Sequence, residues 1–252
     1  MTTVTLNGLR TQMREWGTGP RTLLCLHPLG QEAAFFRELA DGLPGWTVVS
    51  YDQRGHGAAA EQPVEAWSDL VNDAAAALKE TQARHVAGFS MGGSVAADLA
   101  GRAKLAALVL SATPHRGLPV FAQRAHAVRD GGLGAIEAGT IARWFGDAAD
   151  TAAIARARRS LRRMSPEGFD ATWRAFATFE GYEDRTLPPT LLLAYAEDLS
   201  TPPHILDTIM AVIRAQGGTA LRETIPGAGH MGLLQKPVET AATIARFLGE
   251  YG

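Results

Sequence analysis

Short apolar segments alternate with helix-like segments along most of this 252-residue chain, and the alternation restricts the folds open to it. Residues 21–27, 46–51 and 85–89 are short and mostly apolar, as strands buried on both faces of a sheet are. The Ala-rich residues 67–81 have the character of a helix, with a cap expected near Ser68. Strands that alternate with helices form βαβ units, so we expect an α/β fold with a mostly parallel central sheet flanked by helices.

One long segment in the middle of the chain interrupts this alternation. Residues 114–186 contain no apolar run of similar quality and look like several helices, whereas strands are expected again at residues 190–195 and 220–225. The sequence therefore predicts a core formed by residues 1–113 and 187–252, with a helical cap inserted at residues 114–186.

Charge and composition exclude several classes of partner. The chain has 24 Lys and Arg residues against 26 Asp and Glu residues, so its net charge of −2 creates no field that would hold nucleic acid or an anionic membrane. No apolar run approaches the roughly 20 residues of a membrane-spanning helix, and the first residues lack the pattern of a secretory signal. We expect a cytoplasmic protein with neither kind of partner, and the sequence does not set its oligomeric state.

Residues 88–93, GFSMGG, contain the pattern Gly-x-Ser-x-Gly. The pattern alone is weak evidence, because about 0.1 chance matches are expected in a chain of this length and glycine content. Its context is stronger, since an apolar run precedes it and small residues follow, as expected where a strand turns sharply into a helix. Such a turn exposes its serine on a strained backbone. Ser90 is therefore the candidate nucleophile, and a structural Gly-Ser-Gly turn is the alternative.

A serine hydroxyl becomes a good nucleophile only when a base removes its proton. His230 is the candidate base, because it lies in a glycine-rich loop between the last expected strand and the last expected helix. Asp198 follows the expected strand at residues 190–195 and is the candidate to orient the imidazole, with Glu197 as its rival. Because all three segments follow parallel strands, we expect them at one edge of the sheet.

Acyl transfer to a serine places negative charge on the carbonyl oxygen, which amide donors can stabilise. The amide of Met91, directly after the nucleophile, is one candidate donor. The second is expected in the loop after residues 21–27. Pro28 has no amide hydrogen, so Leu29 is the candidate there.

Together these motifs resemble the α/β-hydrolase superfamily over nearly the whole chain. The order Ser90, Asp198, His230 is also the order of that superfamily. Within it, the sequence is most similar to 3-oxoadipate enol-lactonases and related esterases, although it has His27-Pro28 where the superfamily usually has His-Gly. The blocks that carry the likeness are residues 27–30, 52–57, 88–93, 142–145, 165–169, 197–203 and 227–237.

The resemblance implies an α/β-hydrolase fold and a serine hydrolase that cleaves a small-molecule ester or lactone without a cofactor. Other activities use the same triad and remain alternatives: perhydrolase (haloperoxidase) activity, C–C bond hydrolysis, methyl esterase activity and hydroxynitrile lyase chemistry. A ligand receptor without useful turnover is the alternative outside enzymes. Fold analogy does not set the substrate.

Other polar clusters have simpler interpretations. Residues 52–57 resemble a structural turn of the superfamily, and His27 is expected to orient the loop that follows it. The arginine-rich residues 156–163 are expected to form a solvated helix face, with attraction of a substrate carboxylate as the alternative. His115, His126 and His204 lack flanking acidic or cysteine residues at the spacing of metal ligands, and no glycine-rich phosphate loop opens a helix in the first βαβ unit. We therefore expect neither a metal site nor a nucleotide cofactor.

The expected cap suggests where the substrate binds. Both of its ends are expected beside Ser90, so that it covers the site and excludes water. Trp144 and Trp173 are the large aromatic residues best suited to face the pocket. We name Trp144 as the candidate substrate-binding residue, with packing between cap helices or against the core as the alternative.

Overall fold

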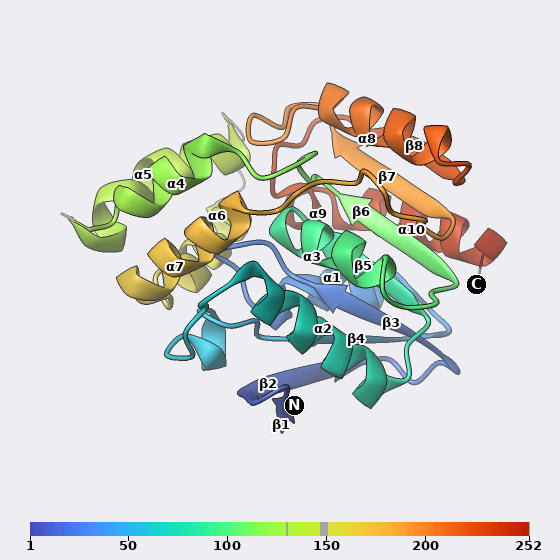
Figure 1. The fold of residues 1–252 in the computed structure, drawn as a ribbon, viewed down its shortest axis with the longest axis horizontal. Helices are drawn as coiled ribbons and strands as arrows, with labels where there is room; N and C mark the ends of the chain where they lie inside the picture. The colour runs from blue at the N-terminus through green and yellow to red at the C-terminus, as the bar shows by residue number, and fades with distance from the viewer. Residues whose placement is uncertain (130, 147–150, 252) are drawn as a thin grey trace.

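An eight-stranded sheet forms the centre of the protein (Figure 1). The structure, a computed structural model, describes residues 1–129, 131–146 and 151–251. In spatial order the strands are β1 (Thr2–Leu6), β2 (Leu9–Trp16), β4 (Trp46–Tyr51), β3 (Arg21–Leu26), β5 (His85–Phe89), β6 (Ala107–Ser111), β7 (Thr190–Tyr195) and β8 (Ala220–Ile225). β1, β2 and β4 pair antiparallel, and all pairs from β4 across to β8 are parallel. The expected α/β fold with a mostly parallel sheet is confirmed.

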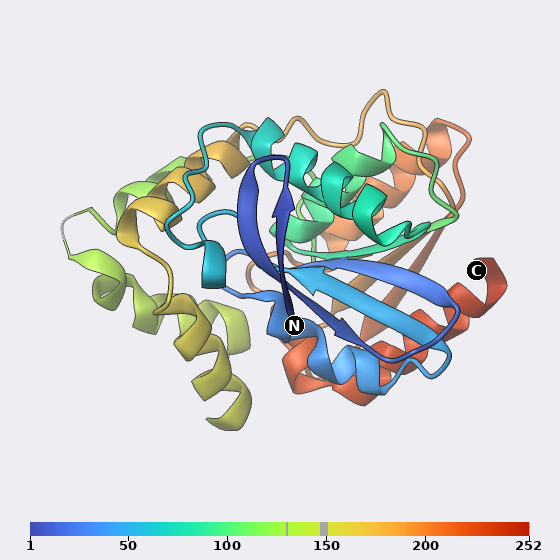
Figure 2. The ribbon, with the colours of Figure 1, turned by 90° about the horizontal axis from the view of Figure 1, so that it is seen from below.

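Helices cover both faces of this sheet (Figure 2). Every residue of β5, β6 and β7 is buried, which explains why these strands are continuous apolar runs. In the part of the chain that the structure describes, no helix is both long and apolar enough to cross a membrane. One face carries α2 (Trp67–Thr81), α3 (Met91–Ala100) and α8 (His204–Ala215), and the other carries α1 (Arg37–Asp41) and α10 (Pro237–Tyr251). The short helices are η1 (Ala33–Phe36), η2 (Gly57–Ala59) and α9 (Gly232–Gln235).

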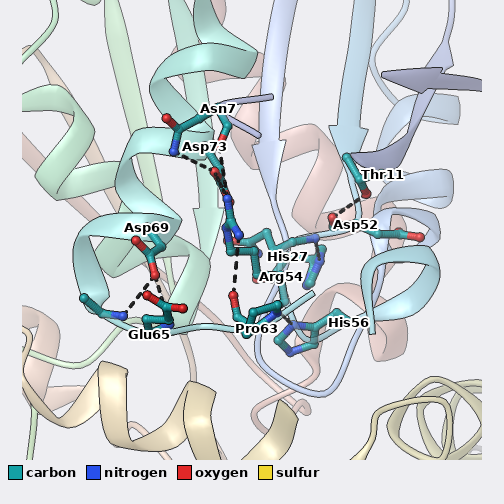
Figure 3. A network of polar contacts seen from close by, with 12 residues as sticks. Asn7, Thr11, His27, Asp52, Arg54, His56, Pro63, Glu65, Asp69 and Asp73 are labelled. Atoms are coloured by element: carbon teal, nitrogen blue, oxygen red, sulfur yellow. Dashed lines mark hydrogen bonds and ion pairs between the residues drawn. The ribbon is translucent and has the colours of Figure 1, made fainter. Parts of the chain in front are cut away.

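The cap of α2 lies at the expected place but is formed by another residue. The helix begins at Trp67, so the cap lies near Ser68 as expected, but Ser68 itself is inside the first turn and is not the capping residue. Instead the carboxylate of Asp69 accepts hydrogen bonds from the amides of Glu65 at 2.9 Å and Ala66 at 3.0 Å (Figure 3). A carboxylate in the first turn can reach back to amides before the helix and also favours its positive end.

Four helices lie together beyond the carboxyl ends of the parallel strands (Figure 1). All regular structure among the described residues between β6 and β7 is helical. Aromatic rings join these helices to the core: Phe176 stacks on Trp67 of α2 with ring centroids 5.5 Å apart, and Phe121 lies 4.7 Å from Phe176. We call this group the inserted helices, which are α4 (Pro119–His126), α5 (Gly132–Phe145), α6 (Thr151–Leu161) and α7 (Pro166–Ala177).

The two ends of this insertion lie at opposite ends of the parallel strands. The expectation that both emerge beside Ser90 is therefore wrong. β6 and β7 are parallel, with Leu108 opposite Thr190. The chain therefore leaves the carboxyl end of β6 and must return to the amino end of β7. The carbonyl of Pro189 accepts the amide of Leu108, near the start of β6, at 3.0 Å. Only the first end of the insertion lies near Ser90.

A partly buried ion pair holds the turn that follows β4 (Figure 3). Arg54 donates to the carboxylate of Asp73 on α2 at 2.6 Å and 3.1 Å, and to the carbonyl of Asn7 at 3.1 Å. The Asp73 side chain is only 1% exposed. On the other side of the turn, Asp52 accepts the amides of Ala33 and Ala58, each at 2.8 Å. These contacts support the interpretation of residues 52–57 as a structural turn.

Replacing Arg54 by Ala should lower the free energy of unfolding by about 3 kcal/mol, because it leaves the Asp73 carboxylate buried without a counter-ion. The matched control is Arg37→Ala, which removes an exposed i,i+4 pair with Asp41 and should change stability by less than about 1 kcal/mol. Urea denaturation of both variants measures the difference. Equal, small losses for the two would show that the Arg54–Asp73 pair does not stabilise the turn.

Candidate active site

Ser90 occupies a strained turn between β5 and α3. Its backbone has φ 52° and ψ −118°, a conformation that residues with side chains adopt rarely and at a cost on the order of 1–3 kcal/mol. Two contacts with the neighbouring β6 segment hold it there. The Ser90 amide donates to the carbonyl of Ser111 at 2.8 Å, and the hydroxyl of Thr113 donates to the Ser90 carbonyl at 3.0 Å.

The glycines on either side of Ser90 allow the backbone to pass this closely. A Cβ on Gly88 would lie 2.2 Å from the carbonyl oxygen of Gly92. A Cβ on Gly92 would lie 2.1 Å from the carbonyl oxygen of Leu26, at the end of β3. The two outer positions of the Gly-x-Ser-x-Gly pattern therefore have a steric reason, and the strand-to-helix context expected from the sequence is present.

The structure brings Ser90, His230 and Asp198 into one chain of hydrogen bonds. His230, in the loop between β8 and α9, places Nε2 3.0 Å from the Ser90 Oγ. Its Nδ1 lies 2.8 Å from Oδ2 of Asp198, which follows β7. An ionised carboxylate only accepts hydrogen bonds, so Nδ1 carries the proton and Nε2 is left to accept the serine proton.

The Asp198 carboxylate is held on both oxygens. Oδ1 accepts the amides of Ser200 at 2.7 Å and Thr201 at 2.8 Å, while Oδ2 faces His230. The rival residue, Glu197, is exposed, whereas Asp198 is buried. Of the two adjacent acids, the structure therefore brings Asp198 to the imidazole.

His27 and Gln53 fix the loop that carries Leu29. Nε2 of His27 accepts the amide of Gln53 at 3.0 Å, so its Nδ1 carries the proton and donates to the carbonyl of Pro28 at 3.0 Å. The side-chain amide of Gln53 donates to the His27 carbonyl at 2.8 Å. Burial lowers the pKa of His27 to about 4, so the ring is neutral near pH 7. The contacts support the loop-orienting role expected for His27, but the sequence did not single out Gln53.

Leu29 and Met91 are both buried at the site. Met91 is the first residue of α3, so its amide has no acceptor within the helix. The Leu29 amide donates to no group in the described part of the chain. Leu29 also lines the same pocket as Ser90 and His230. Both amides therefore remain candidates for holding a developing oxyanion.

A small pocket lies beside Ser90 and His230, beneath the inserted helices. Its volume of about 20 Å³ leaves room for about one water molecule. Four aromatic residues from the inserted helices form part of its wall: Phe121, Trp144, Trp173 and Phe176. The structure thus places both tryptophans singled out in the sequence at the pocket.

Trp144 also packs against the two loops of the site. A Cβ on Gly30, next to Leu29, would lie 2.6 Å from the Trp144 ring. The Trp144 carbonyl accepts the amide of Met231, next to His230, at 3.2 Å. Trp144 as a whole is only 4% exposed. Trp144 therefore lines the pocket and also packs against the core. Both interpretations of this residue, as a pocket residue and as a packing residue, agree with its position.

The arginine-rich residues 156–163, on the end of α6 and just after it, pair with acidic residues and do not line the pocket. Arg156 pairs with Glu38, Arg163 with Glu32, and Arg158 and Arg162 with Glu137. These pairs agree with the expectation that the stretch forms a solvated helix face.

Two other arginines, Arg124 and Arg143, do line the pocket beside Ser90. Sequence reasoning did not find them, and its one available signal was the position of Arg143 directly before Trp144.

Comparison with known proteins places this geometry in context. A model of the alpha/beta hydrolase family matches residues 8–243. An enol-lactonase from Burkholderia xenovorans LB400 is similar in structure, with 22% identity, a TM-score of 0.87, and coverage of 98% of this chain and 100% of the other. An esterase from Thermogutta terrifontis has 23% identity, a TM-score of 0.87 and coverage of 100% and 99%.

A bromoperoxidase from Bacillus anthracis is also similar, with 17% identity, a TM-score of 0.84 and coverage of 98% of this chain and 99% of the other. A search of curated proteins found no match. At these identities the likeness to solved structures describes the fold alone.

The neutral, buried histidines should make the protein lose stability in mild acid. Burial lowers the pKa of His27 to about 4 and that of His56 to about 3, against an ordinary value near 6.5. Between these values the unfolded chain binds more protons than the folded one, so the free energy of unfolding falls as pH falls from about 6.5 towards 4. Within that window the slope should approach about 1.4 kcal/mol per pH unit for each histidine.

Urea denaturation of the wild type and His56→Asn, at pH values from about 7 to about 4.5, measures this slope. His56→Asn should lose stability with pH less steeply than the wild type. The control His204→Asn changes an exposed histidine and should keep the wild-type slope. An equal slope in all three proteins would contradict the role assigned to His56.

Proposed function

The chain belongs to the alpha/beta hydrolase family, and from that membership we propose that it is a serine hydrolase that cleaves a carboxylic ester or lactone. The observation that carries the proposal is the hydrogen-bonded chain from Ser90 through His230 to Asp198. Structural likeness to an enol-lactonase and to an esterase supports this class of substrate.

In the proposed reaction, His230 takes the proton from Ser90 as the hydroxyl oxygen attacks the substrate carbonyl. Asp198 holds the imidazole and stabilises its charged form. The amides of Leu29 and Met91 donate to the oxyanion of the tetrahedral intermediate. His230 then gives the proton to the leaving oxygen, which departs and leaves an acyl group on Ser90.

A water molecule completes the cycle. His230 removes a proton from the water, the hydroxyl attacks the acyl-enzyme, and Ser90 leaves with its proton restored. With a lactone, the leaving oxygen stays tethered to the acyl chain, so the product is the ring-opened hydroxy acid. With an enol-lactone the released enol becomes a ketone, and the product is a keto acid.

The inserted helices would serve as a cap in this reaction. Their side chains line the pocket beside Ser90, and covering the site would exclude water and strengthen the oxyanion contacts. A volume of about 20 Å³ is too small for an ester, so the pocket must widen by movement of its side chains or of these helices. Trp144, which lies between the Leu29 loop and the His230 loop, is the proposed substrate contact.

Replacing Ser90 by Ala should lower kcat for a short-chain 4-nitrophenyl ester on the order of 10⁴-fold or more, because it removes the nucleophile. The matched control is Ser94→Ala, a buried serine of α3 whose hydroxyl contacts Thr113 and not His230. It should keep most of the activity. Wild-type turnover in the folded Ser90→Ala protein would contradict the proposal.

Replacing Trp144 by Ala should raise KM and broaden the range of acyl groups accepted, because it removes part of the pocket wall. The variant should still react with a fluorophosphonate probe at Ser90. The control Trp46→Ala removes a buried ring of β4 that packs edge-on against His85 and does not line this pocket. It should lower Tm without changing acyl preference. If Trp144→Ala likewise lowers Tm and keeps the wild-type preference, Trp144 is a packing residue only.

A further inference from the structure

A hollow in the surface lies at the amino ends of β3 and β5, at the end of the sheet opposite to Ser90. Its volume is about 410 Å³, and the end of α2 and the first residues of both strands line it. His85, the first residue of β5, is part of this lining, whereas Ser90 follows the last residue of the same strand. Five strand residues span about 16 Å, so a small ligand bound here would not touch Ser90.

The ionisable side chains that line this hollow are all basic. They belong to Arg21, Arg84 and His85, and no acid is among the described residues of the lining. Neither arginine has an acidic partner within the part of the chain that the structure describes. The hollow therefore attracts anions.

Trp46 of β4 holds two of these basic groups close together. The Arg21 guanidinium lies over the Trp46 ring, 4.3 Å from its centroid. The His85 ring meets the same indole edge-on, with centroids 4.8 Å apart. Stacking on an aromatic ring fixes the plane of a guanidinium group and leaves its N–H donors available to a ligand.

His85 supplies a second, independent sign of a ligand. The residue is only 7% exposed, and its Nε2 has no hydrogen-bond partner among the described residues. Burial lowers the pKa of His85, a hydrogen bond to the Thr22 backbone acts against this, and the charges of Arg21 and Arg84 lower the pKa further. A buried ring nitrogen without a partner is costly, and a bound anion would relieve both that cost and the repulsion among the three groups.

The end of α2 offsets only part of this positive charge. The helix ends at Thr81, beside the hollow, and the free carbonyls of its last turn act like roughly half a negative charge. Arg21 and Arg84 carry two full positive charges. More than one charge is therefore left for a ligand to balance.

We propose that Arg21, Arg84 and His85 bind the phosphate group of a small ligand at the amino ends of β3 and β5. Guanidinium groups bind phosphate oxygens in pairs, and a phosphomonoester carries about 1.5 to 2 negative charges near pH 7. A carboxylate carries only one charge. A phosphate that keeps one proton can also donate to Nε2 of neutral His85, and its oxygens can accept from the protonated ring. The inference does not rest on the hydrolysis proposed at Ser90.

Calorimetric titration of the full chain at pH 7 and constant ionic strength tests this site, with inorganic phosphate, glycerol 3-phosphate and acetate as the probes. The wild type should bind both phosphates at one site and acetate much more weakly. Arg84→Met should weaken phosphate binding roughly 10-fold or more, because it removes a charge-assisted hydrogen bond and keeps the length of an exposed side chain. The control Arg159→Met removes an exposed charge of α6 and should bind phosphate like the wild type.

A histidine NMR titration locates the bound phosphate. Phosphate should raise the pKa of His85, because a nearby anion favours the charged ring, and should leave the exposed His204 unchanged. Tighter binding of glycerol 3-phosphate would identify an organic phosphate as the ligand, and equal binding of the two would identify inorganic phosphate.

Three results would overturn the site: no binding of either phosphate, acetate bound as tightly as phosphate, or unchanged phosphate binding by Arg84→Met. Ser90→Ala should bind phosphate like the wild type. Failure of the hydrolase proposal would therefore leave this site standing, and loss of the site would leave the hydrolase proposal standing.

Discussion

The close passage of α3 over the ends of β3 and β5 is the constraint on which the rest of the site depends. Because Gly88 and Gly92 lack side chains, the carbonyls of Gly92 and Leu26 occupy space that a Cβ would need. That approach forces Ser90 into its positive-φ turn and directs its hydroxyl towards His230. It also brings the start of α3, with the amide of Met91, beside the end of β3. The proposed nucleophile and one candidate oxyanion donor are thus positioned by one backbone contact.

The polar groups around this contact follow a consistent electrostatic pattern. Two acidic groups have partners: Asp73 pairs with Arg54, and Asp198 accepts two amides as well as the imidazole. His27 is buried too, but it is neutral and bonded on both ring nitrogens. The pocket differs, because its partly buried arginines have no acidic partner among the described residues.

Much of this arrangement could be predicted from the sequence because it depends on local patterns. Buried parallel strands are continuous apolar runs, and the residues that follow them gather at one edge, so the sequence alone was enough to group Ser90, Asp198 and His230. Contacts between distant segments could not be predicted in this way. The partners of Gln53 and the acids that face α6 depend on the tertiary fold, and so does the lack of an acid at Arg143 within the described chain. The return of the insertion to β7 was predicted wrongly, because a parallel strand begins at the edge opposite to the one where Ser90 lies.

The central claim is that the fold makes Ser90 a reactive nucleophile. Intact-mass analysis and peptide mapping after reaction with a fluorophosphonate probe test it most directly, because the probe bonds to an activated serine and needs no knowledge of the substrate. The account predicts one adduct per chain, on Ser90, in protein whose circular dichroism confirms that it is folded. A folded protein that forms no adduct, or forms one at another residue while Ser90 stays unmodified, would contradict it.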